Sequence, residues 1–195
     1  MPKIDGYLTR EKILEVAEKL FSEVGYDAAS IGAISKLAGI NKATIYYHFK
    51  DKLSILHCLY SNMIEQMKNR LMPIDESKID LKSKIKMELN FLREKKNIIS
   101  ILLMESMKTN TSDDSLFRIA SDGINNEKAR LNDLTNAQAK KDLFFVHEFF
   151  TGFVPILNFV VLEEKYRDFF HIDEDKVIEN FIEAIIRSHY NSHIQ

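Results

Sequence analysis

The sequence lacks the residues and motifs that disulfide bonds and common catalytic sites require. Cys58 is the only cysteine in 195 residues, so no intramolecular disulfide can form. The first twelve residues, MPKIDGYLTREK, contain no apolar run. We therefore expect no signal peptide and a cytoplasmic protein. The sequence also has no internal repeat, glycine-rich phosphate loop, nucleophile elbow or metal-ligand set. The sequence therefore offers no residues on which to base an enzymatic function, and we expect no cofactor.

Charge is nearly balanced overall but is unevenly distributed. The net charge is -2 and 45% of the residues are hydrophobic, which is typical of a soluble globular protein with one or two small domains. Between Ser30 and Lys52, four lysines face a single aspartate, a local balance of +3, so the remainder sums to -5. Positive charge is therefore concentrated in one short stretch, as a phosphate-binding surface requires.

That stretch has the pattern of two short helices joined by a turn. An apolar segment, Ile31 to Ala38, ends at Gly39, and Asn41 can open a second helix. Two short helices with a three- or four-residue turn that contains glycine predict a helix-turn-helix. Ile45 and Phe49 lie four residues apart and share one face of the second helix. The remaining surface is polar, basic and aromatic, which suits a phosphate backbone and base edges.

These residues resemble the DNA-binding half of the TetR family of one-component transcriptional regulators. The resemblance rests on Ser30, Ile34, the corner Ala38-Gly39-Ile40, the run Asn41-Lys42-Ala43-Thr44-Ile45-Tyr46, and the close Tyr47-His48-Phe49-Lys50-Asp51-Lys52. It covers about the first quarter of the chain. Ala43 stands where the family usually has glycine, and Gly32 stands where arginine is common. Both departures concern contacts to the operator and leave the fold unaffected.

The resemblance implies which residues contact DNA. Lys42 and Thr44 would enter the major groove and Lys52 would contact phosphate. His48 would contact DNA or phosphate, although a structural role remains open for it. One of the two adjacent tyrosines would pack partly against the rest of the N-terminal helix-turn-helix domain, here called the head, while its hydroxyl reaches phosphate. The full predicted DNA-binding set is Ser30, Lys42, Ala43, Thr44, Tyr46, Tyr47, His48, Lys50 and Lys52.

Apolar periodicity predicts an all-α chain. Thr9 is expected to cap the first helix, and Asp51 the one that runs to about Leu71. Further helices are expected at about 77–95, 97–108, 113–134, 141–165 and 173–189, with caps at Asp113 and Asp173. We expect a helix-turn-helix DNA-binding domain at 1–52 and a larger helical ligand-binding and dimerisation domain at 53–195. The head should pack through Leu20, Phe21, Ile34, Leu37, Ile45 and Phe49.

The stretch from Leu143 to Leu162 is about as long as a membrane span. Because it contains His147 and Glu148, we interpret it as a buried helix in a soluble assembly, with no membrane partner. The pair lacks the second histidine of H-E-x-x-H, so it serves either as a pocket wall or in an internal or intersubunit hydrogen bond. The predicted ligand-binding residues are Met104, Met107, Phe117, Phe144, His147 and Glu148, although such residues also suit plain core.

Two further features favour structural roles. His189 and His193 lie four residues apart and could share a metal, but a solvated chain end is the expected state, so we predict no metal site. Cys58 is expected to be inert.

The resemblance implies a homodimer whose last two helices form the subunit interface. Two heads would bind a palindromic operator in double-stranded DNA, and a small apolar or amphipathic inducer would release it. Most members of the family are repressors. The alternative reading is a helical small-molecule-binding protein that has lost DNA binding, which Ala43 and Gly32 would favour.

Overall fold

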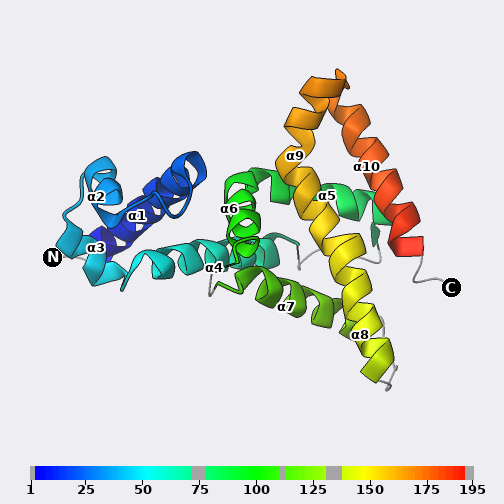
Figure 1. The fold of residues 1–195 in the computed structure, drawn as a ribbon, viewed down its shortest axis with the longest axis horizontal. Helices are drawn as coiled ribbons and strands as arrows, with labels where there is room; N and C mark the ends of the chain where they lie inside the picture. Colours follow the sequence, from blue (N-terminus) through cyan, green and yellow to red (C-terminus); the bar gives the residue numbers. More distant parts are fainter. Residues whose placement is uncertain (1–2, 72–77, 110–112, 131–137, 192–195) are drawn as a thin grey trace. The chain divides into compact units, whose positions relative to one another are not determined.

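The computed structural model describes residues 3–71, 78–109, 113–130 and 138–191, and within these ranges all regular secondary structure is helical. The all-α prediction is therefore confirmed (Figure 1). The helices are α1 (Lys3–Val24), α2 (Ile31–Ala38), α3 (Lys42–His48), α4 (Lys52–Leu71), α5 (Leu81–Glu94), α6 (Lys96–Ser106), α7 (Ser115–Arg130), α8 (Gln138–His147), the π-helical turn η2 (Glu148–Phe153), α9 (Val154–Phe170) and α10 (Glu174–Ser188).

The chain forms two compact units. The first unit contains residues 1–72 and 97–111, and the second contains residues 73–96 and 112–195. This division groups α4 and most of α6 with the three N-terminal helices. The functional boundary expected between residues 52 and 53 stays a prediction, and it does not coincide with this division into compact units.

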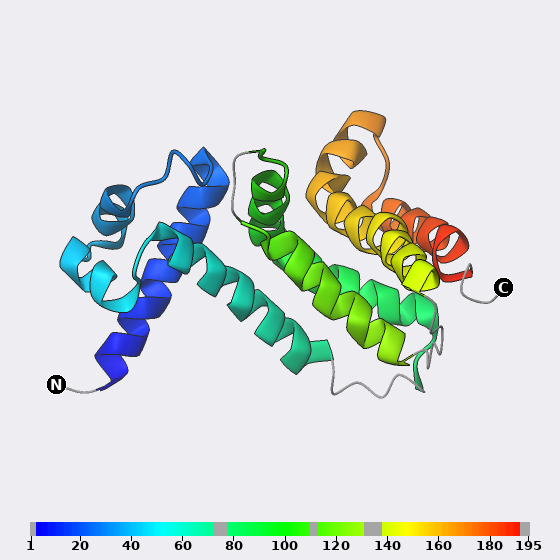
Figure 2. The same cartoon turned by 60° about the horizontal axis from the view of Figure 1, so that its bottom comes forward.

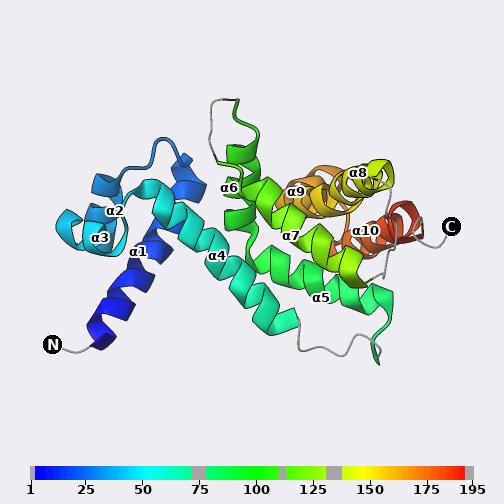
Figure 3. The same ribbon diagram turned by 90° about the horizontal axis from the view of Figure 1, so that it is seen from below.

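The first unit is built on α1, which contacts α2, α3 and α4. Figure 3 shows α1 crossing α4. The helix starts at Lys3, so Thr9 lies inside it and the prediction that Thr9 is its N-cap is wrong. The prediction for α4 is confirmed: the Asp51 carboxylate accepts from Ser54 N–H at 2.7 Å, and the Ser54 hydroxyl oxygen accepts from Asp51 N–H at 3.1 Å. Such reciprocal capping satisfies backbone donors at a helix start.

Five of the six residues predicted for the core of the first unit are buried. Phe21, Ile34 and Ile45 are fully buried, and Leu20 and Phe49 are nearly so. The prediction that Leu37 belongs to this core is wrong, because its side chain is 62% exposed. In α2 the four-residue step from Ile34 leads to Ala38, which is 1% exposed and fills the place in the core.

In the second unit α8, η2 and α9 form one continuous helix from Gln138 to Phe170 that runs beside α10 (Figure 2). The predicted cap at Asp173 is confirmed, because its carboxylate accepts from Asp175 N–H at 3.0 Å. Asp113 accepts from Ser115 N–H at 3.1 Å, but it lies one residue before the N-cap position of α7, where the Asp114 carbonyl accepts the first helical bond. The sequence did not predict the π-helical turn. A π-helical turn makes i→i+5 hydrogen bonds and rotates the side chains around it.

An ion-pair network joins α5, α9 and α10. Arg93, at the end of α5, donates to Glu163 of α9 at 2.9 Å and to Glu174 of α10. Arg167 completes it by donating to Glu174 at 2.7 Å. Glu163 is only 3% exposed, so its carboxylate depends on the Arg93 guanidinium for compensation.

The segment Asp142–Phe170 is long and apolar enough to cross a membrane by length and composition alone. Its two buried carboxylates are held by other helices of the same unit. Glu163 is paired with Arg93, and Glu148 lies 3.4 Å from the His189 ring. These contacts favour our interpretation of this helix as one packed inside a protein.

Candidate nucleic-acid interface

Three local signals shape the turn between α2 and α3. The Ser30 hydroxyl accepts from Ala33 N–H at 3.1 Å and starts α2. Gly39 ends that helix with φ 65°, a left-handed conformation that suits glycine. The Asn41 side chain then accepts from Ala43 N–H at 2.9 Å and starts α3. The prediction of a helix-turn-helix at this place is confirmed.

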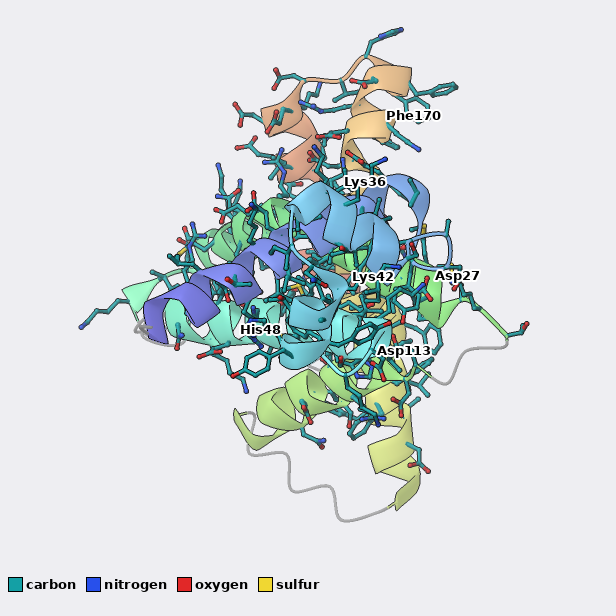
Figure 4. The ribbon with its side chains drawn as sticks, turned by 90° about the vertical axis from the view of Figure 1, so that its left-hand side faces the viewer. Asp27, Lys36, Lys42, His48, Asp113 and Phe170 are labelled. Carbon is teal, nitrogen blue, oxygen red and sulfur yellow. The ribbon has the colours of Figure 1, made fainter. Side chains whose placement is uncertain are left out.

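Helix α3 buries only its inner face. Ile45 is fully buried and Phe49, just after the helix, is 5% exposed. The rest of the helix lies outside: Lys42, Ala43, Tyr46 and Tyr47 are exposed, and Thr44 and His48 are half-buried. Lys36 and Lys50 are also exposed, and Figure 4 labels Lys36, Lys42 and His48 on this part of the molecule. The DNA-binding role of this surface stays a prediction.

The two tyrosines of α3 differ in exposure. Tyr46 is 55% exposed and Tyr47 is 84% exposed, so Tyr46 is the one that packs partly against the head. The Tyr47 ring meets the His48 ring edge-on at 5.1 Å between centroids. A Cβ built at Gly6 would lie 4.0 Å from His48 Cε1, which places this imidazole beside the first turns of α1.

Gly32 leaves room for Lys42. A Cβ at Gly32 would lie 3.3 Å from both Cε and Nζ of Lys42, so the lysine side chain lies back over α2. Because Gly32 replaces the arginine that is common in the family, the ammonium of Lys42 occupies the space over α2. Lys42 is exposed, whereas Gly32 is half-buried.

Lys52 makes several contacts within the first unit. Its ammonium donates to the carbonyl oxygens of Tyr26 at 2.6 Å, Ala29 at 2.9 Å and Asp27 at 3.3 Å. An ammonium has three N–H groups, and in this arrangement all three are used. Desolvation lowers the pKa of Lys52. These bonds hold the turn before α2, and the phosphate contact of Lys52 stays a prediction.

The same turn carries an ion pair with Lys108, which lies two residues after the end of α6. Lys108 Nζ lies 2.5 Å from the Asp27 carboxylate and 2.7 Å from the buried Glu105 carboxylate. The hydrogen bond from Lys108 lowers the pKa of Asp27. Desolvation lowers the pKa of Lys108, but the hydrogen bonds to Asp27 and Glu105 outweigh it, so the pKa of Lys108 is raised. The sequence gave no signal for this contact, since 81 residues separate its partners.

The predicted ligand-binding residues fall in different units. Met104 and Met107 belong to the first unit and are 44% and 71% exposed, while the other four belong to the second. In the second unit, Phe117 of α7 stacks on Phe149 of η2 at 5.6 Å. The expectation that His189 lies at a solvated end is wrong, because His189 is 5% exposed. His193 lies outside the described residues.

Comparison with known proteins agrees with the helix-turn-helix geometry. The sequence profile of the bacterial regulatory proteins of the tetR family matches residues 13–58. The HTH-type transcriptional regulator QacR of Staphylococcus aureus (strain Mu50 / ATCC 700699) is 31% identical over 116 residues, which cover 56% of this chain and 62% of QacR. The biofilm operon icaADBC HTH-type negative transcriptional regulator IcaR of S. aureus (strain Newman) is 48% identical over 46 residues, 24% of this chain and 25% of IcaR.

The similarity in structure extends further than the similarity in sequence. A TetR-like transcriptional regulator from Rhodococcus sp. RHA1 has a TM-score of 0.67 and 15% identity, and the match covers 96% of this chain and 97% of that one. This match concerns the fold alone. The chain spans less than two thirds of the length of either S. aureus relative. Both relatives and the fold neighbour are transcriptional regulators, which agrees with the expectation that this chain is not an enzyme. Residues 13–58 therefore carry the sequence profile of the tetR family, and the chain has the fold of a TetR-like transcriptional regulator.

Proposed function

We propose that the chain is a ligand-responsive transcriptional repressor that binds a palindromic operator as a homodimer. The observation that carries the proposal is the outer surface of α3. It presents Lys42, Thr44 and Tyr46 on a helix-turn-helix whose caps and core are complete. Lys36 and Lys50 add exposed positive charge close by in the sequence. Repression is supported by IcaR, a negative regulator.

The side chains of this surface suit two kinds of DNA contact. Lysines at the edge of the surface, such as Lys50, neutralise phosphates, which positions the head without reading sequence. Residues at the start of the second helix reach base edges in the major groove. Lys42 and Thr44 hold those positions here, and the lysine can donate to guanine O6 and N7.

A dimer is needed because one short helix reads only half of a palindrome. In a two-fold dimer the heads reach successive major grooves about 34 Å apart. The α9 helix offers an interface: Leu162, Tyr166 and Phe169 share one face and are 53%, 49% and 77% exposed. Phe159 lies on the same face and stacks on Phe181 of α10 at 3.8 Å. On the same two helices, Leu157, Val177 and Ile185 are buried inside the second unit and are not available to a partner subunit.

A small apolar or amphipathic molecule is the proposed inducer. The aromatic cluster Phe117–Phe149–Phe153 supports this class, with centroids 5.6 and 6.1 Å apart and Phe117 55% exposed. An inducer that binds better to another spacing of the heads shifts the population away from the DNA-bound form. Operator DNA must then weaken inducer binding by the same factor. Helix α4 begins at Lys52, beside the turn that precedes α2. We propose α4 as the lever that couples inducer binding to the spacing of the heads.

The test is binding to DNA from upstream of the chain's own gene. A labelled palindrome from that region should be bound by the full chain, and binding should weaken linearly in a log–log plot against salt. The matched control is a scrambled duplex of equal length, which should bind more weakly at every salt concentration. If neither duplex is bound at low salt, the chain has lost DNA binding and the small-molecule-binding alternative stands.

A further inference from the structure

The second unit contains a cluster of ligand-capable side chains that the proposed DNA-binding function does not use. His147, Glu148 and His189 each offer one ligand atom, and these atoms all lie within 4.8 Å of one another. Glu148 and His189 are 6% and 5% exposed, and His147 is half-buried. Two residues come from the α8–η2 junction and one from the end of α10. The fold therefore brings together residues 41 positions apart.

The π-helical turn and a glycine make this approach possible. Glu148 is the first residue of η2, and Gly152 lies within the same turn. A Cβ at Gly152 would stand 2.6 Å from Nε2 and 2.7 Å from Cε1 of His189, closer than atoms can pack. The absence of a side chain at Gly152 therefore admits the imidazole ring. Single π-helical turns inside longer helices occur frequently at functional sites.

Thr151 sets which nitrogen of His189 faces the cluster. The Thr151 hydroxyl donates to the His147 carbonyl oxygen at 2.7 Å, so its only proton is used. Its oxygen then accepts from His189 Nδ1–H at 2.9 Å. With the proton on Nδ1, the lone pair of His189 lies on Nε2 and faces Glu148 Oε2 at 3.4 Å. Histidine ligands of metals are commonly held in this way through the other ring nitrogen.

The distance between Nε2 and Oε2 has the value expected of two ligands on one ion. A charge-assisted hydrogen bond between an imidazolium and a carboxylate has a length of about 2.7–2.9 Å, shorter than the 3.4 Å found here. Two ligands at about 2.0–2.1 Å from a tetrahedral zinc ion stand about 3.4 Å apart.

From this geometry we infer that His147, Glu148 and His189 form a binding site for a divalent transition-metal ion of the zinc class. Two imidazoles and a carboxylate are ligands that Zn²⁺ accepts, and three protein ligands leave a fourth position for water or a small molecule. The His147 ring stacks on the His189 ring at 5.2 Å and 20°, so it must turn about its side-chain bonds to direct a nitrogen at the ion. Its partial exposure gives it that freedom. The inference goes beyond the proposed DNA binding and does not rest on it.

The experiment uses the full untagged chain after treatment with a chelator. Isothermal titration with Zn²⁺ should give one ion per chain, and added Zn²⁺ should raise the melting temperature because it binds only the folded state. Co²⁺ should give the visible absorption of a four-coordinate site with nitrogen and oxygen ligands. A chain that binds no ion, or that binds it without these spectral and thermal changes, overturns the inference.

Matched variants locate the site. His147→Gln removes a half-buried ligand, and Glu148→Gln keeps the shape of a buried one. Loss of an outer partner costs about 10–100-fold in metal affinity, so loss of a ligand should cost at least about 100-fold. The control His57→Gln removes an exposed histidine of α4 and should bind as the parent does. If His147→Gln and the control bind equally, the histidine–glutamate contact is a structural hydrogen bond only and the inference is wrong, whether or not Glu148→Gln folds.

Thr151→Val tests the positioning role separately. Valine keeps the volume of threonine and removes the hydroxyl that holds His189 Nδ1. We expect Zn²⁺ affinity to fall about 10–100-fold while the stoichiometry stays at one ion per chain. Unchanged affinity would show that Thr151 does not orient the ring.

Discussion

Lys52 donates a hydrogen bond to the Tyr26 carbonyl oxygen at 2.6 Å, and the same ammonium lies 4.1 Å from the centroid of the Tyr26 ring. One lysine thus serves both the backbone and the aromatic face of the residue that opens the turn before α2. The turn positions α2, and α2 positions α3. Since Lys52 is also the first residue of α4, this contact ties the proposed lever directly to the head.

We expect Lys52→Met to destabilise the protein. Methionine keeps the length of the side chain but leaves three carbonyl oxygens without their donor. Hydrogen bonds to charged groups contribute about 1.5–3 kcal/mol when buried, and this ammonium is partly exposed, so a loss of about 2 kcal/mol is expected. Urea unfolding measures it. The control Lys50→Met, at an exposed position two residues earlier, should change stability by less than about 0.5 kcal/mol.

The same pair of variants separates a structural lysine from a phosphate-binding one. Lys50→Met should lower the salt slope of DNA binding by about one unit per lost contact. Lys52→Met should leave the slope unchanged, provided that binding is measured where both variants are folded. A lower slope for Lys52→Met would restore the phosphate contact that the family resemblance implies.

The features predicted correctly from the sequence are those set within a few residues. Ser30, Gly39 and Asn41 act on backbone groups two to four positions away, so their residue types alone indicate caps and a turn. Lys52 and His189 could not be assigned in this way. Their partners lie 23 to 41 residues away, and only the packed structure decides whether a basic side chain points to solvent or to a carbonyl.

Lys42→Ala tests base reading. If Lys42 contacts a base edge, its loss should cost about 1–3 kcal/mol per half-site on the operator and relax preference at one base position. Thr44→Ala should cost less, because a hydroxyl makes fewer contacts. Competition binding against a set of single-base operator variants measures both. If Lys42→Ala weakens operator and scrambled DNA by the same factor, Lys42 is a phosphate contact.

Phe169→Asp tests the proposed dimer interface. This side chain is 77% exposed within one chain, so its replacement should leave the subunit fold intact. A charge placed in an apolar interface without a partner costs several kcal/mol. Sedimentation should therefore show monomers at micromolar protein. The control Val24→Asp changes an exposed apolar residue of α1 and should remain dimeric. A dimeric Phe169→Asp protein would move the interface away from this face of α9.

Arg93→Met tests the network that joins α5, α9 and α10. It leaves the Glu163 carboxylate, 3% exposed, without the guanidinium that compensates its burial. Removing one partner of a buried pair costs about 3 kcal/mol or more. The double variant Arg93→Met/Glu163→Gln should recover part of that loss because no uncompensated charge remains. The exposed pair Arg187–Glu183 is the control, and Arg187→Met should cost less than about 1 kcal/mol.

The same network should make stability depend on pH through Glu174. The hydrogen bond from Arg93, and then the Arg93 charge, lower the pKa of this carboxyl in the folded protein below the value of about 4.3 for an unfolded chain. On acidification the unfolded state therefore takes up the proton first, and protonation favours unfolding. The contribution of Glu174 is complete above the unfolded pKa and is lost as the pH falls through the folded pKa.

Glu174→Gln removes this titration, so its melting temperature should fall less steeply than that of the parent below about pH 5, while the two curves run parallel near neutral pH. The control Glu179→Gln, at an exposed position on the same helix, should follow the slope of the parent. Equal acid slopes for the Glu174→Gln protein and the parent would mean that the Arg93–Glu174 contact does not persist in solution.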